Sequence, residues 1–77
     1  MTIEQIRKFY QAKPFQPFDI HLADGRALPV LSPEFLAIAP PGRTIGVAGE
    51  DGTIESVDLL LVTSLKPRRT GQRRKQI

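Results

Sequence analysis

The sequence predicts a small, mainly β domain with one N-terminal α-helix, in which about five short strands bend strongly into a small barrel. An apolar period typical of a helix occurs only near the N-terminus. Short alternating apolar stretches follow it, and Asp-Gly and Pro-Pro-Gly turn sequences separate them. A bent barrel removes most of the exposed edges that a flat sheet of this size would have.

The helix is predicted from Thr2 to Lys13. Thr2 is placed to cap the first turn, and Gln5, three residues later, can reach back to close a capping box. Pro14 disfavours helical geometry in the residue before it, so the helix should end there and an extended connector should follow. The apolar side of this helix carries Ile3, Ile6, Phe9 and Tyr10.

The first hairpin begins with residues 18–23, which alternate apolar and polar side chains as a strand with one buried face does. A two-residue Asp-Gly turn would pair Ile20 with Pro29 and turn apolar side chains outward. A three-residue turn with Gly25 in a bulge pairs Ile20 with Leu28 instead, and this register is favoured because it places apolar side chains together.

The remaining elements follow from turn residues. A Ser-Pro-Glu helical turn at residues 32–34 should bend what would otherwise be one long strand from 27 to 39. A second hairpin should join strands 44–48 and 53–57, with its register left open. A helical turn at residues 58–60 should then lead into a last strand at 61–65.

Charge divides the chain into a domain, residues 1–65, and a basic tail, residues 66–77. The first part carries five Lys/Arg and eight Asp/Glu, and the second carries six Lys/Arg and no acid. The net charge of +3 therefore belongs to the tail. The tail has no apolar period before its last residue, so we expect it to be disordered in isolation.

Composition excludes several classes of protein. There is no cysteine, which rules out disulfides and thiolate metal sites. No apolar stretch has the length of a membrane span or of a signal-peptide core, so we expect a soluble, cytoplasmic protein without membrane contact. No motif indicates a cofactor.

The sequence resembles two groups of proteins. The segments PFQPFDIHLADGR at 14–26, PEF at 33–35, GRT at 42–44 and DLLLVTSL at 58–65 together resemble a group of short uncharacterised bacterial proteins, which implies no particular activity. In the order of its elements alone, the chain also looks like the Sm-like and SH3-like barrels. The Sm-like resemblance implies a ring that binds single-stranded RNA.

The tail is a candidate nucleic-acid site. Its cations could neutralise phosphates and release counterions, with contacts that are blind to base sequence. The alternative is a solvated terminus that aids solubility or contacts an acidic surface. The candidate residues are Lys66, Arg68, Arg69, Arg73, Arg74 and Lys75.

The run Leu59, Leu60 and Leu61 is a candidate for self-association. It is apolar on every side, and a chain of 77 residues has one small core. Part of the run could therefore face a second copy of the chain, making a homo-oligomer. The N-terminal helix could instead cover it within one chain.

No catalytic or metal site is predicted. His21, the only histidine, could be oriented by Asp19 on the same strand face, but no nucleophile or second metal ligand accompanies it. The acidic residues near Gly25 and Gly52 are explained as turn formers. We expect a non-enzymatic binding or scaffolding module that self-associates, with an Sm-like ring whose barrel contacts RNA as the alternative.

Overall fold

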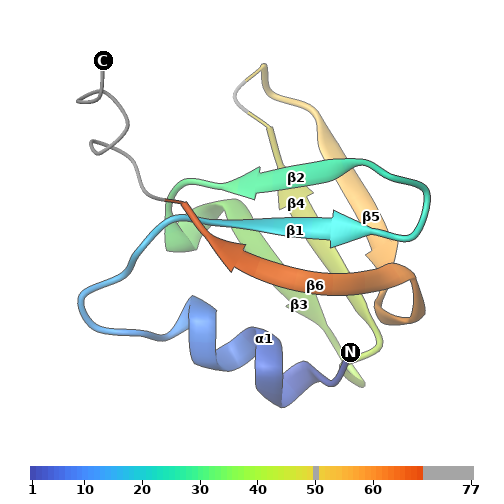
Figure 1. The fold of residues 1–77 in the computed structure, drawn as a ribbon, viewed down its shortest axis with the longest axis horizontal. Coiled ribbons are helices and arrows are strands. Elements are labelled where there is room, and N and C mark those ends of the chain that lie inside the picture. The colour runs from blue at the N-terminus through green and yellow to red at the C-terminus, as the bar shows by residue number, and fades with distance from the viewer. Residues whose placement is uncertain (50, 69–77) are drawn as a thin grey trace.

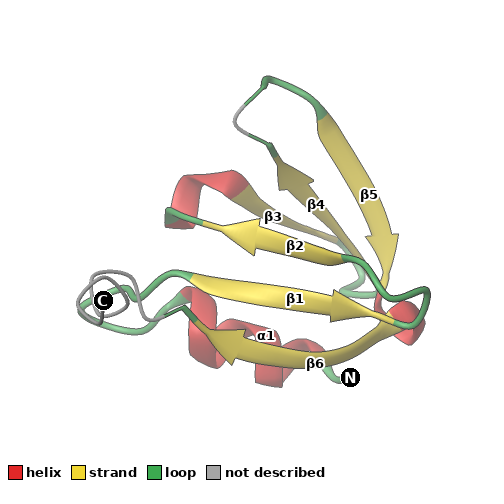
Figure 2. Ribbon diagram, turned by 45° about the horizontal axis from the view of Figure 1, so that its top comes forward, coloured by secondary structure: helices red, strands yellow, loops and turns green. Residues whose placement is uncertain are grey.

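One helix and two three-stranded antiparallel sheets form the part of the chain that the computed structural model describes, residues 1–49 and 51–68 (Figure 1). The first sheet has the strand order β2-β1-β6, and the second has the order β3-β4-β5. Figure 2 shows the two sheets splayed about the middle of the molecule. The elements are α1 (Ile3–Tyr10), β1 (Phe18–Leu22), β2 (Ala27–Val30), η1 (Pro33–Phe35), β3 (Leu36–Ala39), β4 (Thr44–Ala48), β5 (Ile54–Asp58), η2 (Leu59–Leu61) and β6 (Val62–Pro67).

Helix α1 has the predicted capping box. The backbone N–H of Gln5 donates to the Thr2 hydroxyl, and the Gln5 side chain accepts from the Thr2 backbone N–H. The helix ends at Tyr10, with Gln11 as its C-cap, which is three residues before the predicted end at Lys13. Among the described residues no helix is both long and apolar enough to cross a membrane.

The first sheet confirms the bulged hairpin. Ile20 pairs with Leu28, and Phe18 pairs with Val30. Gly25 has a φ of 94°, a conformation that is strained for any residue with a Cβ. On the other side of β1, strand β6 pairs from Val62 to Pro67, with a bulge opposite His21 and Leu22.

The mainly β fold with one N-terminal helix is confirmed, but the count of five strands is wrong. The helical turn predicted at residues 32–34 is present as η1, but the two halves of the stretch 27–39, counted together in the prediction, are the separate strands β2 and β3 of different sheets. Six strands result. A closed barrel is not confirmed, because no ladder of hydrogen bonds joins the two sheets within residues 1–49 and 51–68.

The last helical turn and strand lie slightly further along the chain than predicted. Asp58 caps η2 instead of starting it, because its Oδ1 accepts a hydrogen bond from the Leu60 backbone N–H at 2.9 Å. The second hairpin adopts the register that pairs Val47 with Glu55.

The core lies among the two sheets and the helix. Phe18, Ile20 and Ile6 are fully buried, so β1 and α1 contribute directly to it. The rings of Phe9 and Phe15 pack against the Phe18 ring at centroid distances of 5.1 and 6.0 Å, which ties the helix and the connector to β1. The buried cluster comprises Ile6, Phe18, Ile20, Leu22, Val30, Leu36, Ile45, Val47, Val57, Leu59 and Val62.

Replacing Gly25 should test the turn that sets the first hairpin. A Cβ at Gly25 would meet no atom within 4 Å, so Gly25→Ala changes only backbone strain and should lower the free energy of unfolding by about 1–2 kcal/mol. Gly46→Ala is the control, because its Cβ would make an ordinary 3.9 Å contact with Ile54 and alanine is favoured over glycine in strands. Urea unfolding that shows equal effects for both variants would contradict the turn geometry.

Candidate functional site

Lys66 and Arg68, two of the six candidate phosphate-binding cations, lie in the described chain at and just after the end of β6. Lys66 is exposed and pairs in register with Asp19 of β1. The Arg68 backbone N–H donates to the Pro17 carbonyl at 2.8 Å, and Arg68 Nη1 lies 2.9 Å from Asp19 Oδ1. Strand β6 and its hydrogen bonds therefore continue beyond residue 65, where the basic tail was predicted to begin.

Asp19 gives the C-terminal segment a defined starting point. Its carboxylate pairs with Arg68 and stands opposite Lys66, so one acid offsets part of the charge of two cations. Both partners of the ion pair are partly exposed, and such pairs contribute about 1 kcal/mol or less to stability. The ion pair therefore fixes the position of Arg68 more than it adds to the stability of the fold. The other candidate cations, Arg69, Arg73, Arg74 and Lys75, lie outside the described residues.

The three leucines of η2 have different environments. Leu59 is 7% exposed and belongs to the core, so its side chain is not part of an outer surface. Leu60 is 81% exposed and Leu61 is 51% exposed. A helical turn of three residues points its side chains in different directions, which explains why one enters the core while the others face outward. Self-association through this element can therefore involve only Leu60 and Leu61.

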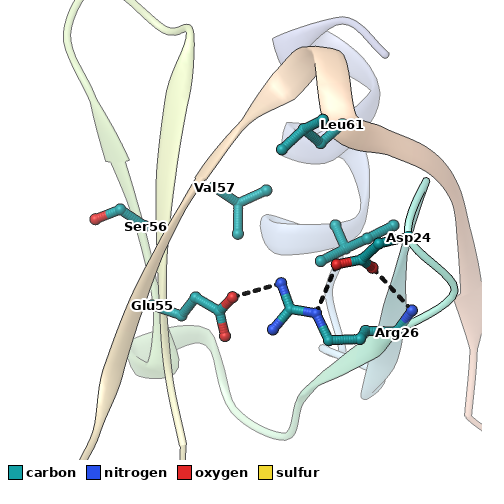
Figure 3. Close-up of a pocket in the computed structure, with 7 residues that line it drawn as sticks. Asp24, Arg26, Glu55, Ser56, Val57 and Leu61 are labelled. Carbon is teal, nitrogen blue, oxygen red and sulfur yellow. Dashed lines mark hydrogen bonds and ion pairs between the residues drawn. The ribbon is translucent and has the colours of Figure 1, made fainter.

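Arg26 connects the first hairpin to β5, as Figure 3 shows. Its Nε lies 2.9 Å from Asp24 Oδ2, and its Nη2 lies 2.7 Å from Glu55 Oε2. The Arg26 backbone N–H also donates to Asp24 Oδ1 at 3.0 Å, which closes a turn around the carboxylate. The guanidinium spans the space between a turn of one sheet and a strand of the other.

These contacts shift the pKa values of Asp24 and Arg26. The Arg26 backbone N–H, and after it the guanidinium, lower the pKa of Asp24 below its ordinary value. The Glu55 carboxylate, followed by that of Asp24, raises the pKa of Arg26. The charged forms of Asp24 and Arg26 are thus stabilised by their neighbours in the folded state.

The hollow beside Arg26 is small and not suited to anions. Its volume is about 80 Å³, and Leu22, Val57 and Leu61 supply its apolar walls. Two carboxylates surround the one guanidinium, so the local charge is negative. Arg26 and Arg43 are the only Lys or Arg residues between positions 14 and 65, and Arg26 is engaged in these ion pairs. The cluster is best explained as a link between the two sheets.

His21 has a defined place among the described residues. It lies on β1 opposite Ala27 and Ser64, and the Asp19 carboxylate that could orient it is paired with Arg68. Within the described part of the chain, no group of three His, Cys, Asp or Glu side chains could hold a metal ion.

Two of these contacts could not be found by sequence analysis. Arg68 and Asp19 are 49 positions apart, and Arg26 meets Glu55 across two different sheets. Local spacing carries no signal for such pairs. The contact between Arg26 and Asp24 could have been predicted from the sequence. An Asp side chain that accepts from the backbone N–H two residues later is typical of a turn.

Comparisons with protein-family models, with curated proteins and with solved structures find no match to this chain. The resemblances to short bacterial proteins and to Sm-like and SH3-like barrels therefore stay predictions.

Acid should destabilise the protein through two turn carboxylates. The Thr53 hydroxyl and backbone N–H lower the pKa of Asp51, as the Arg26 contacts lower that of Asp24. A lowered folded-state pKa gives stability that is complete above about pH 4 and is lost as the pH falls through the folded-state value.

Asp24→Asn and Asp51→Asn combined should flatten the loss of thermal stability below about pH 4. Glu34→Gln is the control, since Glu34 makes no ion pair with any described residue. An unchanged acid dependence in the double variant would refute this assignment.

Proposed function

We propose that the protein is a non-enzymatic binding module that holds nucleic acid without base specificity through its C-terminal cations and associates with further copies of itself. The observation that carries the proposal is the charge distribution. Six cations and no acid occupy residues 66–77, and the ion pair between Arg68 and Asp19 fixes the start of this segment against β1. A dense, unbalanced cationic segment is the electrostatic footprint of phosphate binding.

The binding would proceed by neutralising phosphates and releasing counterions, so its affinity should fall steeply with salt. Asp19 offsets the charge of Arg68, which leaves five of the six cations for phosphates. Residues 66–77 contain no aromatic side chain for stacking on bases. Such a segment would position nucleic acid without reading its sequence.

The alternative is an Sm-like ring in which the sheets themselves contact RNA. The two sheets, with η2 between the last two strands, would then act as an open version of the small Sm-like or SH3-like barrel. Against this alternative stands the pairing of Arg26 with two carboxylates, which offset the charge of one of the few cations on the sheets.

Neutralising the C-terminal cations in the full-length chain should test the proposal. Changing Arg69, Arg73, Arg74 and Lys75 to Gln should lower the slope of log affinity against log salt for single strands from about −3.5 to about −0.7, at about 0.7 per phosphate contact. Arg43→Gln, an exposed cation in the turn before β4, is a single-charge control and should change little. Affinity for RNA that survives with base preference would favour the ring and contradict the proposal.

Self-association should depend on Leu60. Leu60→Asp should convert an oligomer into a folded monomer, measured by size-exclusion chromatography with light scattering. Leu59→Asp is the matched change in the core, and it should unfold the chain because it buries a charge without a partner. A wild-type protein that stays monomeric at high concentration, or a Leu60→Asp variant that unfolds, would refute the role of this surface.

A further inference from the structure

Four strands form the outer edges of the two sheets, namely β2, β6, β3 and β5. Strand β2 contains Pro29, and β6 ends with Lys66 and Pro67. Strand β3 is followed directly by Pro40 and Pro41. Lys and Pro at an edge oppose pairing with another chain, because Lys keeps its charge in water and Pro has no backbone N–H to donate. Three of the four edges therefore carry residues that oppose further pairing.

Strand β5 is the exception among these edges. Neither Lys, Arg nor Pro occurs between positions 53 and 65, a stretch that includes the whole strand. Within the described residues the backbone of β5 pairs with β4 alone, and Figure 2 shows β5 as the outer strand of its sheet. The N–H and C=O groups on its outer side can therefore bind a further strand.

The exposed large apolar side chains of the described chain stand at the two ends of β5. Ile54 begins the strand and is 74% exposed. Leu60 and Leu61 follow in η2, directly after the strand ends at Asp58. An antiparallel partner strand would bring its own start to the end of β5. In such a pair Ile54 of each copy would meet the leucines of the other, and water would be excluded from both.

We infer that two copies of the chain join β5 to β5 around a two-fold axis, so that their second sheets become one continuous sheet with the order β3-β4-β5-β5-β4-β3. This inference rests on the self-association in the proposed function and specifies which strand of the partner is bound. A two-fold axis lets one surface serve both copies and closes the assembly at two. Backbone hydrogen bonds supply the affinity, as in other complexes that add a strand to a sheet edge.

The charges of β5 favour the register that places Ser56 on the axis. Ser56 then stands opposite Ser56 of the second copy, Glu55 opposite Val57, and Ile54 opposite Asp58, so that all five residues of β5 are paired. An axis at Glu55 would instead set two carboxylates directly opposite each other, which destabilises a strand pair. With Ser56 on the axis, the two Asp58 side chains are four residues or about 14 Å apart along the strands.

The test compares Ser56→Cys with Ala37→Cys in the full-length protein, which has no other cysteine. Ala37 pairs with Gly46, and Gly46 pairs with Ser56, so the two positions lie in one row on the same face of the sheet, at its opposite edges. Both residues are exposed, and Figure 3 shows Ser56 pointing away from Arg26.

Ser56→Cys should form a covalent dimer under mild oxidation, measured by non-reducing electrophoresis. Directly opposite residues have Cβ atoms about 4.5–5.5 Å apart, which a small adjustment brings within the span of a disulfide. Association raises the effective concentration of one thiol beside the other, so the reaction should be on the order of tenfold faster than for Ala37→Cys. Ile54→Cys should react as slowly as Ala37→Cys, because its two copies would lie about 14 Å apart along the strands.

A second pair of variants, Ser56→Lys and Ala37→Lys, tests the same edge without oxidation. Each adds one positive charge at an exposed position, but only Ser56→Lys would set two like charges opposite each other across the axis. Light scattering after size-exclusion chromatography should show a monomer for Ser56→Lys and a dimer for Ala37→Lys, with circular dichroism spectra like that of wild type.

The outcomes separate this inference from the proposed function. Equal cross-linking of Ser56→Cys and Ala37→Cys would overturn the pairing of β5 with β5, and self-association would still stand if Leu60→Asp dissociates the wild-type assembly. A wild-type assembly of more than two copies would also overturn the inference, since it requires pairing between two different edges. A monomeric wild type would refute both the inference and self-association, and would leave the binding of nucleic acid by the C-terminal cations untouched.

Discussion

The alternation of buried and outward side chains along β1 is the constraint on which the rest of the structure depends. Phe18, Ile20 and Leu22 face the core, and β1 is the central strand of its sheet. A slip of one residue would turn Asp19 and His21 inward and expose the three apolar side chains. The positions of β2 and β6 follow from this register. The helix follows too, because the Phe9 ring packs on Phe18.

The same register places the charges. Asp19 faces outward because Phe18 and Ile20 face inward, and the pairing of β1 with β6 then sets it opposite Lys66 and within reach of Arg68. The burial of apolar side chains on β1 thus decides which part of the surface holds the first C-terminal cations. Arg26 shows the opposite arrangement, since carboxylates on both sides offset its charge.

The helix start and the first hairpin could be predicted from the sequence because a few neighbouring residues determine each of them. Gly25 can adopt positive φ, so the bulged hairpin and its register could be derived. Thr2 and Gln5 specified the start of the helix. The division of residues 27–39 between two sheets could not be predicted, because it depends on which distant strands compete for each half. The contacts of Arg68 with Asp19 and of Arg26 with Glu55 could not be predicted for the same reason, since they join positions that only the folded chain brings together.

The bond between Arg68 and Pro17 also limits how far from the sheets the arginines that follow it can lie. Arg74 comes six residues after Arg68, and even fully extended these six residues would span about 20 Å. Anything captured by the outermost arginines is therefore held within one molecular diameter of the sheets. At that range the local concentration of a captured partner beside the folded body is high, and even a weak secondary contact there becomes effective.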